Sequence, residues 1–278
     1  MNRSGPRMNT LSISQLSTLR WDMATDAAAY AAHGFDGIGI YRPKLADYGL
    51  DQTIELLAET SLAVTSLSWA GGFTGSDGRP VLDAVNDAIG AVREAANLRA
   101  ETLIVLAGGR NNHIRSHARR TLCDALLEIS LAAESFGVQL SLEPIHPGCG
   151  DEWSFINDLQ AALDIIETVG HPNLGMTLDT YHVGMDEDTL AWLPDVVPYL
   201  RLVQFGDGRH SPVGEMNRCL LGDGCIANQK IFDCLIDSGY SGPMEIELIG
   251  EDVENVGYDD VLEHARIFFD RMTGTVRS

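Results

Sequence analysis

Eight short apolar runs alternate with longer segments of helical periodicity along this chain, and this alternation constrains the fold more than any other feature. The runs are Leu11–Ser14, Gly37–Tyr41, Val64–Ser68, Thr102–Leu106, Val138–Leu142, Leu174–Leu178, Leu202–Phe205 and Met244–Leu248. Between them, apolar residues recur on one helical face, as in Val81, Val85 and Ala88. Such alternation predicts a parallel sheet, and eight repeats of about 35 residues each predict a closed (β/α)₈ barrel of the TIM type.

An open, doubly wound sheet is the alternative architecture, but it usually carries a glycine-rich turn after its first strand. Here Gln15-Leu16-Ser17 follows the first run. No linker or change in composition divides the 278 residues. We therefore expect one α/β barrel domain over residues 9–274, preceded by a flexible N-terminal tail at residues 1–8. The segment from Gly206 to Ile226 is rich in glycine and charge, and we expect it to form a long loop after the seventh strand.

Charge and cysteine content restrict the partners and the compartment. The chain has 19 basic and 40 acidic residues, which gives a formal net charge of −21. Nucleic acids and anionic membranes both attract basic surfaces, so we expect neither as a partner. The five cysteines show no paired spacing and are interpreted as reduced thiols. With no signal peptide and no long apolar segment, the sequence predicts a cytoplasmic protein without a membrane span.

Polar residues stand at the carboxyl ends of the last four predicted strands. Glu143 follows the fifth strand, Asp179 follows the sixth, and Gln204 lies in the seventh. The eighth carries Glu245 and Glu247, of which Glu247 lies nearer the carboxyl end, where barrels of this kind place their sites. Neighbouring buried carboxylates repel one another, and a divalent cation removes that penalty. The predicted metal ligands are therefore Glu143, Asp179, Gln204 and one glutamate of the eighth strand, for which Glu247 is better placed than Glu245. Their oxygen donors favour one Mn²⁺ or Mg²⁺ ion over Zn²⁺ or Co²⁺.

Five motifs resemble those of the xylose-isomerase-like family of sugar isomerases and epimerases, which includes hydroxypyruvate isomerases. They are Gly34-Phe35-Asp36-Gly37-Ile38, Glu143-Pro144-x-His146-Pro147, Leu178-Asp179-x-Tyr181-His182, Gly222-Asp223-Gly224 and Gly239-Tyr240-x-Gly242-Pro243-x-x-x-Glu247. The resemblance implies a TIM barrel with one divalent metal held by the four residues above, and it assigns Glu247 as the ligand from the eighth strand. Two positions depart from the common pattern. Many members have histidine where this chain has Gln204, and many have glutamate where it has Gly39.

The resemblance also implies the reaction, which is isomerisation or epimerisation of a ketose or aldose sugar or of a small hydroxy-keto acid in carbohydrate metabolism. Such reactions remove a proton from the carbon next to a carbonyl and pass through a metal-stabilised enediolate. The resemblance makes Glu143 and Glu247 the acid/base pair. By position, His146 is a further catalytic candidate. Four residues are candidates for binding the substrate, namely His182, Arg209, His210 and Trp69.

Other functions stay open at this point. A lyase or dehydratase of a keto-sugar or keto-polyol could use the same metal site, with elimination in place of reprotonation. An apurinic endonuclease would need several zinc ions and more histidines, and the negative charge of the chain repels DNA. A barrel retained only as a binding partner would need no metal. We expect a small neutral carbohydrate or keto acid as substrate, and assembly as a homodimer or tetramer.

Overall fold

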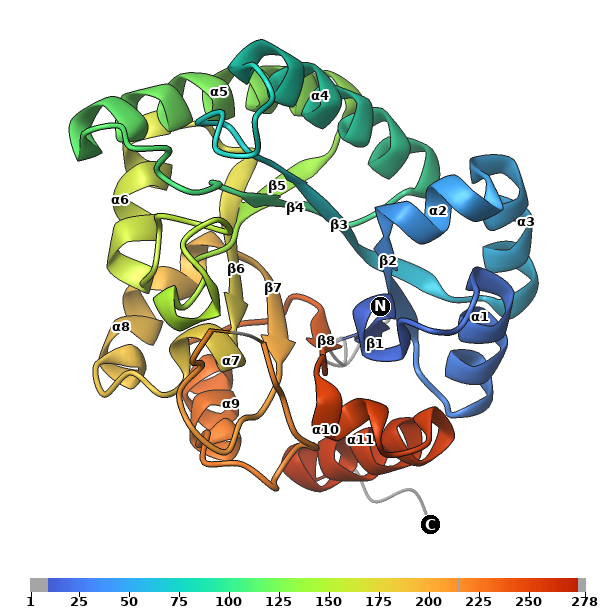
Figure 1. Cartoon of the computed structure of the whole chain (residues 1–278). Coiled ribbons are helices and arrows are strands. Elements are labelled where there is room, and N and C mark those ends of the chain that lie inside the picture. Colours follow the sequence, from blue (N-terminus) through green and yellow to red (C-terminus); the bar gives the residue numbers. More distant parts are fainter. Residues whose placement is uncertain (1–9, 215, 275–278) are drawn as a thin grey trace, which may run out of the picture.

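A computed structural model of the chain describes residues 10–214 and 216–274. Its eight parallel strands are hydrogen-bonded in chain order, and β8 pairs with β1 to close the barrel (Figure 1). The strands are β1 (Leu11–Ser14), β2 (Gly37–Tyr41), β3 (Ala63–Gly71), β4 (Thr102–Leu106), β5 (Gln139–Leu142), β6 (Leu174–Asp179), β7 (Leu200–Phe205) and β8 (Met244–Ile246). The (β/α)₈ barrel predicted from the alternation is confirmed. The expected tail at residues 1–8 lies outside the described residues.

Helices form a layer around the strands (Figure 1). They are α1 (Met23–Ala32), α2 (Arg42–Tyr48), α3 (Leu50–Thr60), α4 (Val81–Leu98), α5 (Arg115–Phe136), α6 (Leu159–Val169), α7 (Thr180–Val183), α8 (Thr189–Val196), α9 (Asn228–Asp237), α10 (Glu251–Glu254) and α11 (Tyr258–Thr273). Short 3₁₀ turns lie at η1 (Gln15–Thr18), η2 (Pro147–Cys149) and η3 (Val197–Tyr199).

Helix boundaries follow local sequence signals. Asp158 precedes α6, and its side chain accepts a hydrogen bond from the Ala161 backbone N at 2.7 Å, as N-cap residues do. Gly137 ends α5 with φ of 69°, a left-handed conformation that glycine adopts without steric cost. The start of α6 and the end of α5 are therefore set by local capping residues.

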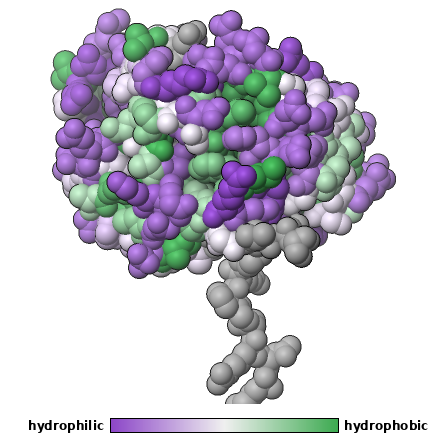
Figure 2. Space-filling model, turned by 90° about the horizontal axis from the view of Figure 1, so that it is seen from below, coloured by the Kyte–Doolittle hydropathy of each residue, from purple (hydrophilic) through white to green (hydrophobic). Residues whose placement is uncertain are grey.

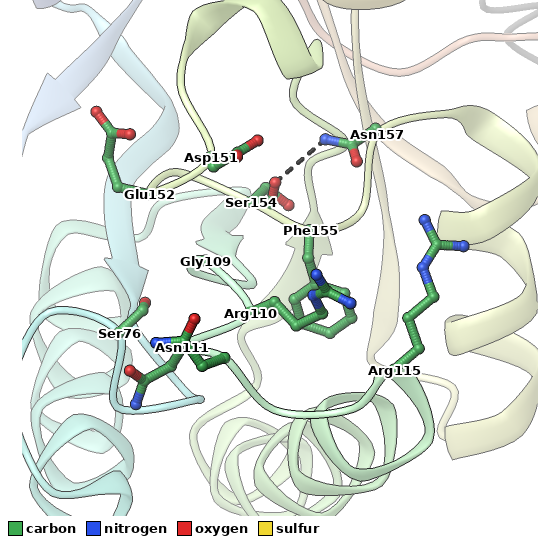
Figure 3. A pocket seen from close by; sticks show the side chains of 11 residues that line it. Ser76, Gly109, Arg110, Asn111, Arg115, Asp151, Glu152, Ser154, Phe155 and Asn157 are labelled. Carbon is green, nitrogen blue, oxygen red and sulfur yellow. Dashed lines mark hydrogen bonds between the residues drawn. The ribbon is translucent and has the colours of Figure 1, made fainter.

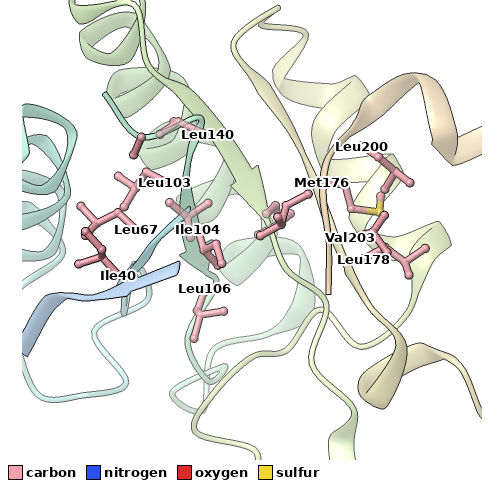
Figure 4. Packing of buried hydrophobic residues seen from close by; sticks show 14 of the residues in the cluster. Ile40, Leu67, Leu103, Ile104, Leu106, Leu140, Met176, Leu178, Leu200 and Val203 are labelled. Carbon is pink, nitrogen blue, oxygen red and sulfur yellow. The ribbon is translucent and has the colours of Figure 1, made fainter. Parts of the chain in front are cut away.

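The strands are buried on both faces, as expected for a parallel barrel covered by helices. Figure 4 shows the buried apolar side chains of β2 to β7 packed between neighbouring strands. The labelled ones are Ile40, Leu67, Leu103, Ile104, Leu106, Leu140, Met176, Leu178, Leu200 and Val203. Full burial of one such side chain contributes about 1.5–3 kcal/mol. This core fixes the strand ends that carry the polar residues.

Three strands end at a different residue from the one predicted. β6 includes Asp179, which we expected to follow it. β3 continues to Gly71 and so includes Trp69, whereas we expected it to end at Ser68. β8 ends at Ile246 and not at Leu248, so Glu247 lies directly after its strand, as Glu143 does after β5. Both glutamates therefore stand at the same end of the barrel.

The surface is mostly polar. Figure 2 shows one side of the molecule, on which polar side chains predominate and apolar ones form small separate groups. In the part of the chain that the structure describes, no helix is both long enough and apolar enough to cross a membrane.

Candidate active site

The four side chains predicted to bind a metal are buried neighbours at the carboxyl end of the barrel. The Nε2 atom of Gln204 donates to Oε2 of Glu247 at 2.8 Å. Asp179 Oδ2 and Glu247 Oε1 lie 2.8 and 2.9 Å from one nitrogen, Nη2 of Arg218. One ligand atom of each of Glu143, Asp179 and His182 lies within 4.8 Å of the others. Three carboxylates, one amide and one imidazole thus share a small volume.

Arg218 is the cation of this cluster, and it is fully buried. It comes from the long loop after β7, which the structure places between Gly206 and Ile226 as expected. Its backbone N donates to the carbonyl of Ile249 at 2.7 Å, and its guanidinium lies 4.7 Å from the ring centroid of Tyr181. Sequence reasoning missed Arg218, because nothing in the spacing of this loop separates it from Arg209, the arginine that we selected.

Burial governs the electrostatics of the cluster. It raises the pKa of Glu143 well above its usual value, and the charges of Asp179 and Glu247 add to the effect. Burial also raises the pKa of Glu247 to about 7, although Arg218 opposes the shift. For His182, burial and the charge of Arg218 hold the pKa well below its usual value, so the imidazole is neutral. Three carboxyl groups against one guanidinium leave the site short of positive charge, which favours an additional cation.

Glu245 fixes the orientation of the Gln204 amide. Nε2 of Gln204 donates to Oε1 of Glu245 at 2.9 Å as well as to Glu247, so both amide hydrogens point at carboxylates. Its Oε1 atom is buried and has no hydrogen-bond partner. Glu245 in turn accepts hydrogen bonds from Thr65 at 2.8 Å and Ser66 at 2.9 Å. A buried carbonyl oxygen without a donor, beside three carboxylates, fits a divalent metal.

The glycine at position 39 makes room for Glu245. A Cβ atom at Gly39 would collide with the Glu245 carboxylate and with Oγ of Ser66. β2 therefore contributes no side chain at this level of the barrel interior, and β8 supplies the carboxylate.

We expect Glu245→Gln to weaken binding of Mn²⁺ by about 10–100-fold, as loss of a group that orients a metal ligand typically does. A glutamine at 245 can present a carbonyl or an amino group, so the Gln204 amide is free to turn its Nε2 toward the ligand position. Isothermal titration with MnCl₂ measures the change. Ser12→Ala is the control, since it removes a 3.4 Å contact to Glu245 together with contacts to Thr65 and Met244, but keeps the carboxylate. An unchanged affinity in Glu245→Gln would contradict this role.

A cleft of about 390 Å³ opens over the cluster, and Glu143, His182, Arg218 and Glu247 line it. Nε2 of His182 lies 3.8 Å from carboxylate oxygens of both Glu143 and Asp179. Its Nδ1 lies 3.6 Å from Sγ of Cys149, which also faces the cleft. Trp69 lines the cleft as well. Of the four candidates for binding substrate, His182 and Trp69 are therefore the two that line the same cleft as the carboxylates, and His182 lies next to them.

The other three residues predicted for catalysis or substrate binding, His146, Arg209 and His210, do not line the cleft. His146 is half-buried, and its Nδ1 accepts a hydrogen bond from the Gly148 backbone N at 3.0 Å, which caps the short turn η2. Arg209 is exposed and pairs with Asp252 at 3.1 Å, and His210 is also exposed. His146 and His210 thus contact their own loops, and Arg209 contacts α10.

Asp207 organises the loop that carries Arg218. Its Oδ1 accepts hydrogen bonds from the backbone N of Gly208 and Ile226, at 2.9 and 3.2 Å. Its Oδ2 accepts from the backbone N of Gly222 and Gly224, at 2.8 and 3.3 Å. One carboxylate thus ties both ends of the loop together, and Arg218 lies between them.

We expect Asp207→Asn to destabilise the loop by about 1–3 kcal/mol, because an NH₂ group replaces one acceptor and leaves buried donors unpaired. Hydrogen exchange of residues 206–226 should rise, and the unfolding temperature should fall. Asp223→Asn is the matched control, because Asp223 is an exposed acid of the same loop. Equal exchange rates in the two variants would overturn the role of Asp207.

A second hollow, of about 440 Å³, is lined mostly by polar residues (Figure 3). Arg110, Arg115 and Asp151 line it, and Glu152 is the one residue common to both linings. None of the clustered carboxylates lines this hollow, so we place the candidate site in the cleft.

Comparison with known proteins gives consistent matches. Residues 27–268 match the family model described as xylose isomerase-like TIM barrel. An inosose isomerase of Halalkalibacterium halodurans is 27% identical over 158 residues, which cover 55% of this chain and 54% of that protein. A ketose 3-epimerase of Arthrobacter globiformis is 32% identical over 122 residues, which cover 44% and 38%. These matches thus span about half or less of the two relatives. The crystal structure of an IolI protein with a bound zinc atom has a TM-score of 0.83 at 20% identity and covers 97% of this chain and 99% of that one.

Proposed function

The chain belongs to the xylose isomerase-like TIM barrel family, and on this premise we propose that it is a divalent-metal-dependent isomerase or epimerase of a keto sugar, an inosose or a small hydroxy-keto acid. One observation carries the proposal, which is the convergence of Glu143, Asp179 and Glu247 on a single buried place at the carboxyl end of the barrel. The two curated relatives act, by their names, on inososes and ketoses, which supports a keto-carbohydrate substrate.

The proposed metal ligands are Glu143, Asp179, Gln204 and Glu247, with Gln204 binding through its unpartnered Oε1. A divalent ion there would polarise the carbonyl of the substrate and neutralise the negative charge that develops on it. The oxygen donors favour Mn²⁺ or Mg²⁺. Zinc belongs in every test panel, because a protein of the same fold binds it.

Glu143 and Glu247 are suited to moving protons because burial raises the pKa of both, and that of Glu247 to about 7. In the proposed reaction, one takes the proton from the carbon next to the carbonyl and the other returns a proton. The neutral His182 can hydrogen-bond a substrate oxygen, and Arg218 holds a fixed positive charge beside the same place. Trp69 is proposed as a wall of the cleft. His146, Arg209 and His210 have no role in this proposal.

The test uses the full chain loaded separately with Mn²⁺, Mg²⁺, Co²⁺ or Zn²⁺. Each preparation is incubated in D₂O with D-fructose, D-psicose, D-tagatose, an inosose and hydroxypyruvate, and the products are followed by NMR. Deuterium incorporation together with an isomerised or epimerised product supports the proposal. An unsaturated or cleaved product would establish the lyase alternative in its place, and absence of exchange with every metal and substrate would refute the proposal.

We further propose a cytoplasmic protein that assembles as a homodimer or tetramer and acts on a small molecule. All five cysteines are unpaired in the structure, which agrees with a reducing compartment. The net charge of −21 speaks against nucleic acid as a partner.

A further inference from the structure

The two halves of the barrel line the cleft with different chemistry. The strands β5 to β8 and the loops after them provide its acids and Arg218. The strands β1 to β4 and the segments directly after them provide Leu16, Leu19, Tyr41, Ser68, Trp69, Ile104 and Leu106. Among the described residues, no charged side chain from this second half lines the cleft. The charged residues among this lining therefore all come from β5 to β8 and the loops after them, which also provide apolar residues such as Ile145, Trp153 and Met216.

Three aromatic rings form a continuous surface in the cleft, and we call Tyr41, Trp69 and Trp153 the aromatic wall. The rings of Tyr41 and Trp69 are stacked, with centroids 5.6 Å apart and an interplanar angle of 29°. Trp153 meets Trp69 edge to face at 5.4 Å. All three side chains are half-buried and face the cleft. The faces of these rings offer no hydrogen-bond partner, so a group that presents hydroxyls to the ring faces would lose water there without compensation.

The cations near the aromatic wall are already paired. The guanidinium of Arg42, which donates to the backbone carbonyl of Trp69, lies 3.0 Å from Asp87 and 2.9 Å from Glu94. Arg218 is the one lysine or arginine of the described residues that lines the cleft, and it is held by Asp179 and Glu247. A phosphate or carboxylate lying along the aromatic wall would therefore find no counter-charge.

We propose that the substrate is a keto sugar or keto polyol that carries an uncharged aromatic substituent. The sugar end would lie at Glu143, His182 and Glu247, and the substituent would pack along the aromatic wall. The cleft volume of about 390 Å³ falls in the range of about 300–1,000 Å³ that accommodates drug-sized ligands, which leaves room for more than one ring. Only the placement of the sugar end rests on the proposed function.

Two glucosides that differ only in their substituent test the inference. The Mn²⁺-loaded full chain is titrated calorimetrically with methyl β-D-glucopyranoside and phenyl β-D-glucopyranoside. We expect the phenyl compound to bind about tenfold more tightly or better, because it buries additional apolar area. Trp153→Ala should remove most of this preference and leave the affinity for the methyl compound unchanged. The Trp153 side chain makes only packing contacts, since its loop is held through its backbone N and O.

Trp192→Ala, on α8 and outside the cleft lining, is the control and should keep the preference. If Trp153→Ala has a lower unfolding temperature than the wild type, the phenyl preference is also measured in Trp69→Leu, which should reduce it. Equal affinities for the two glucosides, or a phenyl preference that survives both cleft variants, would overturn the inference. Deuterium exchange into free ketoses without a phenyl preference would refute the inference and leave the proposed function standing. A phenyl preference in a protein that catalyses no exchange would support the aromatic wall and refute the proposed function.

Discussion

Glu143→Gln should lower kcat by about 10²–10⁴-fold at saturating metal, the usual contribution of a group that transfers a proton. The glutamine has nearly the same shape but neither takes nor gives a proton at neutral pH. In the metal-free protein, the same change should leave the unfolding temperature unchanged or raise it, because burial and the neighbouring carboxylates already disfavour the charged form of Glu143. Deuterium exchange by the metal-loaded protein and a thermal melt after treatment with EDTA measure the two effects.

The control for Glu143→Gln is Glu152→Gln. Glu152 also lines the cleft, but it is exposed and lies outside the cluster, so this variant removes the same formal charge without touching the proposed proton transfer. Its kcat should stay near that of the wild type. A Glu143→Gln protein that exchanges deuterium at the wild-type rate would contradict the assignment of Glu143.

The barrel could be predicted because the sequence signals for its strands and helices are local. Each apolar run and each helix carries its own periodicity, and residues such as Gly137 and Asp158 mark helix ends by their own backbone and capping chemistry. Once eight strands are ordered around a closed sheet, their carboxyl ends meet at one rim. The proximity of Glu143, Asp179 and Glu247 follows from that geometry alone, without knowledge of any loop.

The rest of the site depends on contacts that are distant in sequence. Arg218 enters the cluster only because Asp207 ties both ends of a long loop together and Ile249 fixes the arginine backbone. The sequence does not show which residues of this loop point inward. We therefore predicted Arg209 and His210 as site residues, and the structure places both at the surface. The orientation of Gln204 could not be predicted either, because it depends on a carboxylate of the neighbouring strand.

Arg218→Met should destabilise the protein by about 3–5 kcal/mol when metal has been removed with EDTA, since the loss of one partner leaves buried charges uncompensated. The guanidinium contacts both Asp179 and Glu247 and is itself fully buried. Thermal melts of the chelated protein measure the loss. Arg218→Lys keeps a positive charge and should recover part of it. Arg209→Met, an exposed arginine of the same loop paired with Asp252, should change stability little.

Mn²⁺ binding by the same variants tests whether Arg218 has only a structural role or shares Asp179 and Glu247 with a cation. If Arg218 supplies positive charge where the proposed metal ligands converge, its removal should tighten Mn²⁺ binding, because one repulsive charge is gone. A ligand that binds only the folded state stabilises it by RT ln(1 + L/Kd), where L is the free ligand concentration, so a lower Kd gives a larger effect at the same concentration. Mn²⁺ should then raise the unfolding temperature of Arg218→Met more than that of the wild type or Arg209→Met. An equal rise in all three proteins would mean that the guanidinium does not influence cation binding at the cluster. The assignment of Asp179 and Glu247 as ligands of one ion would then have to be abandoned.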